Sequence, residues 1–146
     1  MVSTSHPEAS RAAVRILERG GNAVDAALAA HLVLSVVEPQ HVSISGGGVM
    51  LYKAQNGTAL HVDFREEAPS AYNAMTFCRN LTCLTDAGCV CNGTWPSLER
   101  CTGPHATGVP GVPALLALVE RDGLGTMSLS EVAQSAIELA KEGWDP

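Results

Sequence analysis

The chain has few basic residues and no cluster of them. Its 146 residues include 9 Lys and Arg against 15 Asp and Glu, which gives a formal net charge of −6. A surface that binds nucleic acid or anionic lipid needs a concentration of positive charge. We therefore expect neither nucleic acid nor an anionic membrane surface as a partner.

Several familiar catalytic and metal-binding motifs are also absent. The sequence has no Gly-x-Ser-x-Gly elbow, no His-Glu-x-x-His motif and no Cys-x-x-Cys pair. Glu66 and Glu67 are sequence neighbours, so in a strand their side chains point to opposite faces and do not form an acid–base pair. The residues by themselves predict no metal site, no cofactor and no visible nucleophile.

Long apolar runs are missing as well. Residues 1–7 lack the apolar core of a signal peptide, so we expect either a cytosolic protein or a chain whose natural N-terminus lies further upstream. The apolar stretch 23–37 is too short, and too interrupted by Asp25 and His31, to cross a bilayer. With 46% hydrophobic and 16% charged residues, the chain is expected to form one globular domain over residues 1–146.

The apolar stretch 23–37 predicts a helix that is buried on most sides, because Ala, Leu and Val surround it almost completely. Asn22 is placed to cap its first turn, and Asp25 stands where a carboxylate meets free backbone N–H groups. Pro39 pushes the residue before it out of helical angles and so ends the helix. His31 is expected to be a satisfied core residue.

Three further helices are predicted from apolar residues at helical spacing. The first follows Ser5-His6-Pro7-Glu8, which has the form of a capping box, and ends at Gly20-Gly21. The second begins near Pro113 and ends at Asp122-Gly123. The third follows a second capping box, Ser128-Leu129-Ser130-Glu131.

Two strands complete a layered mixed α/β fold. Residues 49–52 have the pattern of a buried strand, and the glycines at 46–48 before it favour close packing of two backbones over phosphate binding, since no Lys-Ser or Lys-Thr pair follows them. Asn56-Gly57 predicts a hairpin, and residues 59–64 alternate as its return strand. Arg65 then comes at a strand end. An arginine there is most often a solvated charge, but its planar fork of donors is also suited to gripping a carboxylate at two points.

The helical and strand patterns stop between about residues 70 and 107. Two glycosylation sequons begin there, at Asn80 and Asn92, and all five cysteines lie there: Cys78, Cys83, Cys89, Cys91 and Cys101. Sequons inside a cysteine cluster favour a secretory route. We interpret the segment as a disulfide-stapled, glycosylated surface insertion, with one thiol left unpaired or paired outside this chain.

Six short motifs occur in a characteristic order outside this insertion: Ser5-His6-Pro7-x-Ala9-Ser10, Gly20-Gly21-Asn22-Ala23-Val24-Asp25-Ala26-Ala27, Val37-Glu38-Pro39, Ile44-x-Gly46-Gly47-Gly48, Arg65-Glu66-x-Ala68-Pro69 and Gly108-Val109-Pro110-Gly111. In residues and in order they resemble the γ-glutamyltransferases, also called glutathione hydrolases. Ser45 and Val49 depart from the family's usual glycine and large hydrophobic residue. These departures affect packing more than chemistry.

The resemblance implies an N-terminal-nucleophile hydrolase fold, in which two stacked β-sheets lie between helical layers as an αββα sandwich. It implies an enzyme that transfers the γ-glutamyl group of glutathione and its conjugates to water, amino acids or peptides. Family members cleave their own precursor, and the new N-terminal threonine of the smaller piece, which opens a Thr-x-His pattern, is the nucleophile. We expect this chain to be the beginning of the larger piece, with no catalytic residue of its own and the small-subunit remainder as its partner.

Arg65 matches the family arginine that binds the α-carboxylate of the γ-glutamyl group, so the resemblance implies a substrate-binding role for it. Two alternatives stay open: an acylase of the same fold with another substrate, and a non-catalytic secreted relative. Arg65 favours γ-glutamyl transfer over the acylase, because an α-carboxylate calls for a fixed two-point cation. The resemblance and the insertion together imply the extracellular face of the plasma membrane or the secretory pathway.

The insertion generates a prediction about processing. Expressed through a secretory pathway, the chain is expected to carry glycan at Asn80 or Asn92 and at least one disulfide, because sequons and cysteines are both modified on that route. Intact mass before and after glycosidase treatment and thiol alkylation measures both. The double variant Asn80→Gln/Asn92→Gln is the control for the glycan. A product with five free thiols and no glycan contradicts the prediction.

Overall fold

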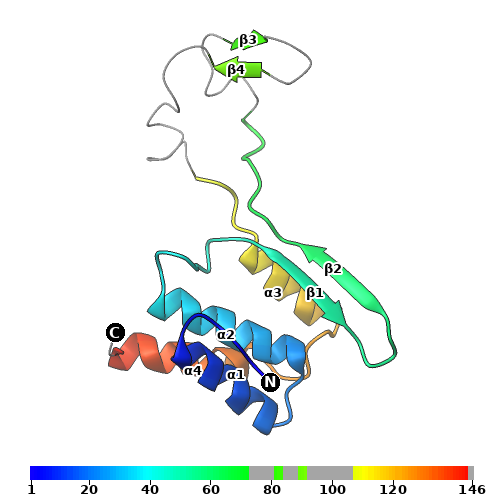
Figure 1. Ribbon diagram of the computed structural model, residues 1–146, viewed down its shortest axis with the longest axis vertical. Helices are drawn as coiled ribbons and strands as arrows, with labels where there is room; N and C mark the ends of the chain where they lie inside the picture. Colours follow the sequence, from blue (N-terminus) through cyan, green and yellow to red (C-terminus); the bar gives the residue numbers. More distant parts are fainter. Residues whose placement is uncertain (73–80, 84–88, 92–106, 145–146) are drawn as a thin grey trace. The chain divides into compact units, whose positions relative to one another are not determined.

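The structure, a computed structural model, describes residues 1–72, 81–83, 89–91 and 107–144. The chain divides into two units: unit 1 is Met1–Glu66 with Pro110–Pro146, and unit 2 is Glu67–Val109 (Figure 1). Unit 2 contains the predicted insertion at about 70–107. Its described part pairs β3 (Leu81–Cys83) with β4 (Cys89–Cys91) in antiparallel fashion.

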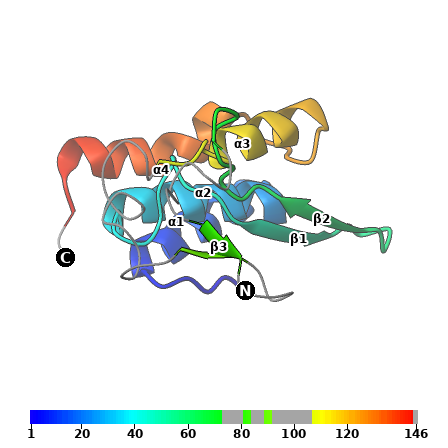
Figure 2. The same cartoon turned by 90° about the horizontal axis from the view of Figure 1, so that it is seen from above.

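Unit 1 is built from four helices and one β-hairpin. Its elements in chain order are α1 (Pro7–Glu18), α2 (Ala23–Val37), β1 (Val49–Lys53), β2 (Ala59–Asp63), α3 (Val112–Arg121) and α4 (Leu129–Glu142). Helix α2 packs against both α1 and α4, and the hairpin lies along one side of the helices (Figure 2). The mixed α/β fold predicted from the sequence is confirmed.

Helix α2 is the centre of the hydrophobic core, as its composition predicted. Its buried residues lie at nearly every angle around the axis: Val24, Asp25, Ala26, Leu28, Ala29, Ala30, Leu32, Val33 and Val37. The helix ends at the C-cap Glu38, immediately before Pro39. In the described parts of the chain, no helix combines the length and apolar character that crossing a membrane requires.

Asp25 joins the beginning of α2 to the loop between α3 and α4. The side chain of Asn22 accepts from the backbone N–H groups of Val24 and Asp25, and the Asp25 carboxylate accepts from the Asn22 N–H at 2.8 Å, which completes the predicted cap. The same carboxylate, only 1% exposed, accepts from the Thr126 hydroxyl at 2.7 Å, from the Thr126 N–H at 3.0 Å and from the Met127 N–H at 3.4 Å. This buried charge is therefore fully hydrogen-bonded, as burial in a core requires.

These bonds also set the acidity of Asp25. Burial by itself raises the pKa of the Asp25 carboxyl, but the hydrogen bonds from Asn22, Thr126 and Met127 outweigh it and hold the pKa below its ordinary value of 3.8. The side chain of Asn22 adds a second link between the same elements, because its Nδ2 donates to the Leu124 carbonyl at 2.7 Å.

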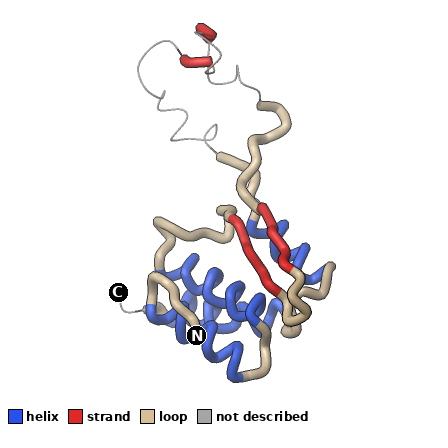
Figure 3. The backbone as a smooth tube through the Cα atoms, turned by 45° about the vertical axis from the view of Figure 1, so that its right-hand side comes forward, coloured by secondary structure: helices blue, strands red, loops and turns tan. Residues whose placement is uncertain are grey.

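The hairpin is formed as Asn56-Gly57 predicted, with Gly57 at a φ of +88°, which glycine adopts without steric cost. Strands β1 and β2 lie side by side (Figure 3) and run antiparallel. Met50 is paired with Val62 and Leu51 with His61. Val62 is buried, and Met50, Tyr52 and Phe64 pack against the helical core.

The prediction that residues 49–52 form a buried strand is wrong for one face. Leu51 is 81% exposed and Val49 is 55% exposed. The reason is that the strand belongs to a two-stranded hairpin, of which one face meets the helices and the other is left uncovered by the residues that the structure describes.

The first capping box was also misassigned. Helix α1 is capped by His6, whose Nδ1 accepts from the Glu8 N–H at 3.2 Å, and not by Ser5. The hydroxyl of Ser5 instead donates to the Glu38 carboxylate at 2.7 Å. Pro7 is the first helical residue, so the cap falls on the residue before it. The second box is confirmed, with Ser128 and Glu131 bonded reciprocally at the start of α4.

The hydrogen bonds that the Asp25 carboxylate accepts from Asn22, Thr126 and Met127, called here the Asp25 joint, generate a prediction about stability. Asp25→Asn is expected to lower the free energy of unfolding at pH 7 by at least about 2 kcal/mol, because hydrogen bonds to a charged group are lost and the new NH₂ faces backbone donors. Because the folded-state pKa is depressed, the contribution is complete above the ordinary value of 3.8 and disappears as pH falls through the folded-state pKa. The difference between wild type and variant is thus expected to shrink in acid. Urea unfolding of the 146-residue chain between pH 7 and pH 3 measures it.

Glu131→Gln supplies the matched control, since Glu131 is an exposed carboxylate in an equivalent capping box. It is expected to cost much less stability than Asp25→Asn, because water replaces the lost bonds at an exposed cap. Equal losses from the two variants, or a loss at Asp25 that is independent of pH, would show that the buried joint is not a special source of stability.

Candidate functional site

Arg65 follows the paired region of the hairpin directly. The Phe64 N–H donates to the Gly48 carbonyl at 2.9 Å and the Gly48 N–H donates to the Phe64 carbonyl at 3.2 Å, which extends the ladder by one pair beyond β2. Arg65 thus stands just past the strand end at which the sequence placed it. Its side chain is 70% exposed.

Two glycines, Gly47 and Gly111, lie close to the backbone of the residues that flank Arg65 in sequence. A Cβ on Gly47 would stand 2.5 Å from the Phe64 carbonyl oxygen and 2.7 Å from the Glu66 nitrogen. A Cβ on Gly111 would overlap the Phe64 carbonyl oxygen outright. The glycine run therefore permits two backbones to pack closely, as the sequence predicted, and this holds for Gly111 as well.

The same contact fixes the beginning of α3. Gly111 is its N-cap and offers no side chain to cap it. The Gly46 carbonyl takes that place, because it accepts from the N–H groups of Gly111 and Val112, both at 3.0 Å. The first turn of α3 is therefore anchored on the glycine segment that backs Arg65.

The guanidinium of Arg65 is available to a ligand. Among the residues that the structure describes, its nearest charged partner is Glu66, whose Oε2 lies 3.7 Å from Arg65 Nε, which is too far for a hydrogen bond. The backbone N–H of Arg65 donates to Asp63 Oδ1 at 3.0 Å. Within the described ranges no hydrogen bond occupies the planar fork of donors, whose geometry suits a carboxylate held at two points.

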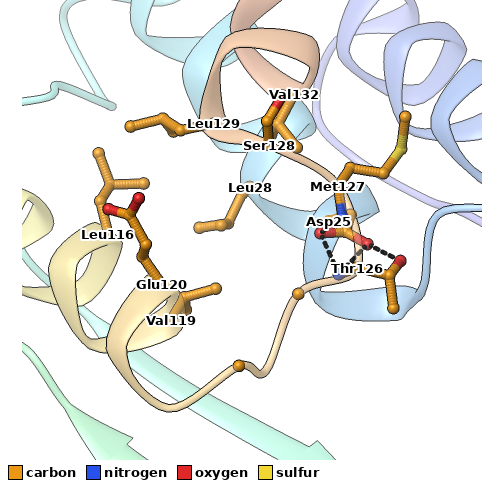
Figure 4. A pocket seen from close by; sticks show the side chains of 12 residues that line it. Asp25, Leu28, Leu116, Val119, Glu120, Thr126, Met127, Ser128, Leu129 and Val132 are labelled. Carbon is orange, nitrogen blue, oxygen red and sulfur yellow. Dashed lines mark hydrogen bonds between the residues drawn. The ribbon is translucent and has the colours of Figure 1, made fainter.

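A pocket lies between α2, α3 and α4, with a volume of about 320 Å³ (Figure 4). Its wall is mostly apolar, with Leu28, Leu116 and Val132 among its residues. Asp25 faces it, but Figure 4 shows that carboxylate directed at Thr126, to which it is bonded. Because Asp25 is committed to structural bonds, this pocket presents no free catalytic group from α2.

His31 departs from the prediction that it is a satisfied core residue. It is half-buried, and its buried Nε2 has no hydrogen-bond partner within the described parts of the chain. Burial lowers the pKa of His31 and outweighs the opposite effect of the Ser43 backbone, so the neutral imidazole is favoured. No cluster of His, Cys, Asp or Glu in the described ranges has the arrangement of a metal site.

One Thr-x-His triplet, the pattern with which nucleophiles of the resembled family begin, does occur at Thr4-Ser5-His6. The Thr4 hydroxyl donates to the His6 carbonyl at 2.8 Å and lies 2.7 Å from the Ser10 hydroxyl. His6 itself is the N-cap of α1. These bonds give the triplet a structural role at the start of the helix.

The predicted modification sites fall largely outside the described residues. Asn80, Asn92, Cys78 and Cys101 lie there, and for Cys83, Cys89 and Cys91 the structure describes only the backbone, in β3 and β4. Glycosylation and disulfide formation therefore stay predictions, as does the substrate-binding role of Arg65.

Sequence reasoning missed two parts of the site, Gly111 and Asp63. Gly111 was noticed as the last residue of a Gly-Val-Pro-Gly motif, but nothing in that motif indicates that it meets Phe64. The signal for Asp63 was its spacing, since an aspartate two residues before a backbone N–H often accepts from it.

In sequence, this chain is similar to known proteins over nearly its whole length. The family model for gamma-glutamyltranspeptidase matches residues 9–145. The glutathione hydrolase proenzyme of Escherichia coli K12 is 38% identical over 144 residues, which is 99% of this chain and 23% of that protein. The acylase ACY 1 proenzyme of Pseudomonas sp. strain V22 is 39% identical over 145 residues, 99% of this chain and 25% of that protein. The chain thus spans about a quarter of these relatives.

Comparison of structures agrees. The crystal structure of Helicobacter pylori gamma-glutamyltranspeptidase superimposes with a TM-score of 0.80 at 35% identity, over 97% of this chain and 37% of that one. The match extends over nearly all of the present chain in both kinds of comparison. This chain therefore belongs to the gamma-glutamyltranspeptidase family.

Proposed function

We propose that this chain is the N-terminal part of the large subunit of an enzyme that transfers the γ-glutamyl group of glutathione and its conjugates to water, amino acids or peptides. The observation that carries the proposal is Arg65, whose side chain is 70% exposed and whose guanidinium makes no hydrogen bond to a described residue. The names of the relatives, glutathione hydrolase proenzyme and gamma-glutamyltranspeptidase, support the substrate class.

The chemistry of the γ-glutamyl group explains why an arginine is needed. The group carries an α-carboxylate at the end remote from the bond that is broken, so a cation at a fixed place orients the donor without touching the reacting carbonyl. Arginine supplies two parallel donors for this purpose, whereas lysine offers a single point charge. In this proposal Arg65 binds, and the acyl-enzyme forms on a threonine outside this chain.

The proposal includes a partner made from the same precursor. Both curated relatives cited above are named as proenzymes, which supports cleavage of a precursor into pieces. A threonine at the new N-terminus of the smaller piece would use its own amine as the base. The small-subunit remainder would therefore bring the nucleophile to the donor that Arg65 holds.

The uncovered face of the hairpin supports the αββα sandwich. Leu51 and Val49 expose apolar side chains on the face opposite the helices, and a two-stranded hairpin is marginally stable alone. A second sheet stacked on this face would bury them, at about 10 Å from the first. In this arrangement α1, α2, α3 and α4 belong to one of the helical layers.

The similarity to an acylase proenzyme keeps one alternative open, an acylase of the same fold with another substrate. The two functions differ in what they ask of Arg65. A donor with an α-carboxylate requires it, and an acyl group without one does not. For location we propose the secretory pathway or the extracellular face of the plasma membrane, on the strength of the sequons and cysteines in the insertion.

The proposal predicts that residues 1–146 alone are inactive, because the nucleophile is supplied by another piece. Purified chain is expected to release no product from a γ-glutamyl anilide above the buffer rate. The single variant Thr4→Ala tests the one Thr-x-His triplet in the sequence. Turnover that follows the protein through purification and disappears in Thr4→Ala would place the nucleophile within this chain and overturn the assignment.

In the complete proenzyme, Arg65→Ala and Arg65→Lys are each expected to raise the donor KM by at least about tenfold, the effect of about 1.4 kcal/mol of lost binding. Lysine keeps the charge but loses the two-point geometry. Self-cleavage should be largely kept, because that step acts on the protein's own backbone. Steady-state kinetics and the fraction of processed precursor on a gel measure the two effects.

Arg121→Ala is the matched control, since Arg121 is a similarly exposed arginine in the same unit, with its side chain 72% exposed. Its donor KM is expected to equal that of wild type. An unchanged KM in processed Arg65→Ala enzyme would make Arg65 an ordinary surface charge and remove the support for the donor assignment.

A further inference from the structure

The position of Arg65 is set through its backbone. Its side chain is 70% exposed, and its charged neighbour Glu66 is 3.7 Å away, so side-chain packing does little to fix the guanidinium. The backbone around it is restrained much more closely, by Gly47 and Gly111 against the Phe64 carbonyl and by Asp63 against the Arg65 N–H. A long flexible side chain is only as well placed as the Cα from which it extends.

We propose that Gly111 and Asp63 are positioning residues for Arg65, and that they set the affinity for the γ-glutamyl donor without touching it. The inference rests on the proposed function of Arg65 and adds two residues that determine how it performs. Each acts on a different atom. Gly111 limits where the Phe64 carbonyl lies, and Asp63 holds the N–H of Arg65 itself.

Gly111 acts by having no side chain. Its N–H and that of Val112 are bonded to the Gly46 carbonyl at 3.0 Å, so the first turn of α3 is fixed and does not retreat freely. A methyl group at Gly111 would overlap the Phe64 carbonyl oxygen, and a Cβ there would lie 3.1 Å from the Arg65 carbonyl oxygen as well. The chain segment carrying Arg65 would have to move. Such a shift would misplace the guanidinium and weaken its hold on the donor carboxylate.

Asp63 acts through one oxygen. Its Oδ1 accepts from the Arg65 N–H at 3.0 Å and turns the chain as it leaves β2. Asparagine keeps an oxygen at this place, and alanine does not. Because Asp63 is exposed, both substitutions leave the core intact. The pair Asp63→Asn and Asp63→Ala therefore separates the hydrogen bond from the rest of the side chain.

The test uses the complete proenzyme and compares Gly111→Ala, Asp63→Ala, Asp63→Asn and Arg65→Ala. Donor KM, kcat, melting temperature and processed fraction are measured for each. Gly123→Ala is the control for inserting a methyl group at a glycine: it lies at a φ of +61° with no atom within 4 Å of the added carbon, so it strains the backbone without displacing Arg65.

Gly111→Ala is expected to raise the donor KM of the processed enzyme by about tenfold or more, while kcat changes far less. Its melting temperature is expected to fall further than that of Gly123→Ala, because the added methyl group meets backbone atoms. Asp63→Ala is expected to raise KM by about threefold or more, and Asp63→Asn is expected to restore it to within about twofold of wild type. A merely structural role would lower stability and processing in step and would leave the KM of the processed enzyme unchanged.

The results for the four variants distinguish a failure of the positioning inference from a failure of the proposed function. If Arg65→Ala raises KM but Gly111→Ala and Asp63→Ala match Gly123→Ala, the positioning inference is wrong and the proposed function stands. If Arg65→Ala leaves KM unchanged, the proposed function itself is wrong. Should Gly111→Ala fail to fold, the Asp63 pair decides: an Asp63→Ala enzyme with the KM of wild type overturns the inference.

Discussion

One buried carboxylate holds the helical part of this protein together. Asp25 closes the first turn of α2 and at the same time accepts three hydrogen bonds at 2.7–3.4 Å from Thr126 and Met127, at the far end of the sequence. A buried charge without those donors would be strongly unfavourable, so these hydrogen bonds are needed for Asp25 to be buried. It fixes where α2 begins and where α4 starts, and the hydrophobic core fills the space between.

The candidate site depends on this core indirectly. The inner face of the hairpin packs on the helices through Val62 and Phe64, and the Gly46 carbonyl secures the first turn of α3 beside it. Two glycines then bring three segments within backbone contact at Phe64. The result is an arginine with an exposed side chain on a closely restrained backbone. A restrained backbone favours recognition of a small carboxylate at one place, because it limits where the guanidinium can lie.

Local features of the sequence predicted most of the fold, because they depend on neighbouring residues. The cap at Asn22, the stop at Pro39 and the turn at Asn56-Gly57 each follow from backbone preferences. Long-range features were not predictable in this way. Nothing near Asp25 indicates Thr126 as its partner, and nothing near Gly111 indicates Phe64. The exposure of Leu51 was missed because an apolar strand pattern indicates that a face is to be covered. The pattern does not indicate which segment covers it. Arg65 was singled out by its motif and its chemistry together.

The central claim is that Arg65 recognises an α-carboxylate, and product binding tests it most directly. L-Glutamate carries that carboxylate, and 4-aminobutyrate is the same molecule without it. Inhibition constants of both are to be measured for processed wild-type enzyme and for Arg65→Ala. The account predicts that wild type prefers L-glutamate by at least about tenfold and that Arg65→Ala binds the two about equally. A preference for L-glutamate that survives intact in Arg65→Ala would contradict it.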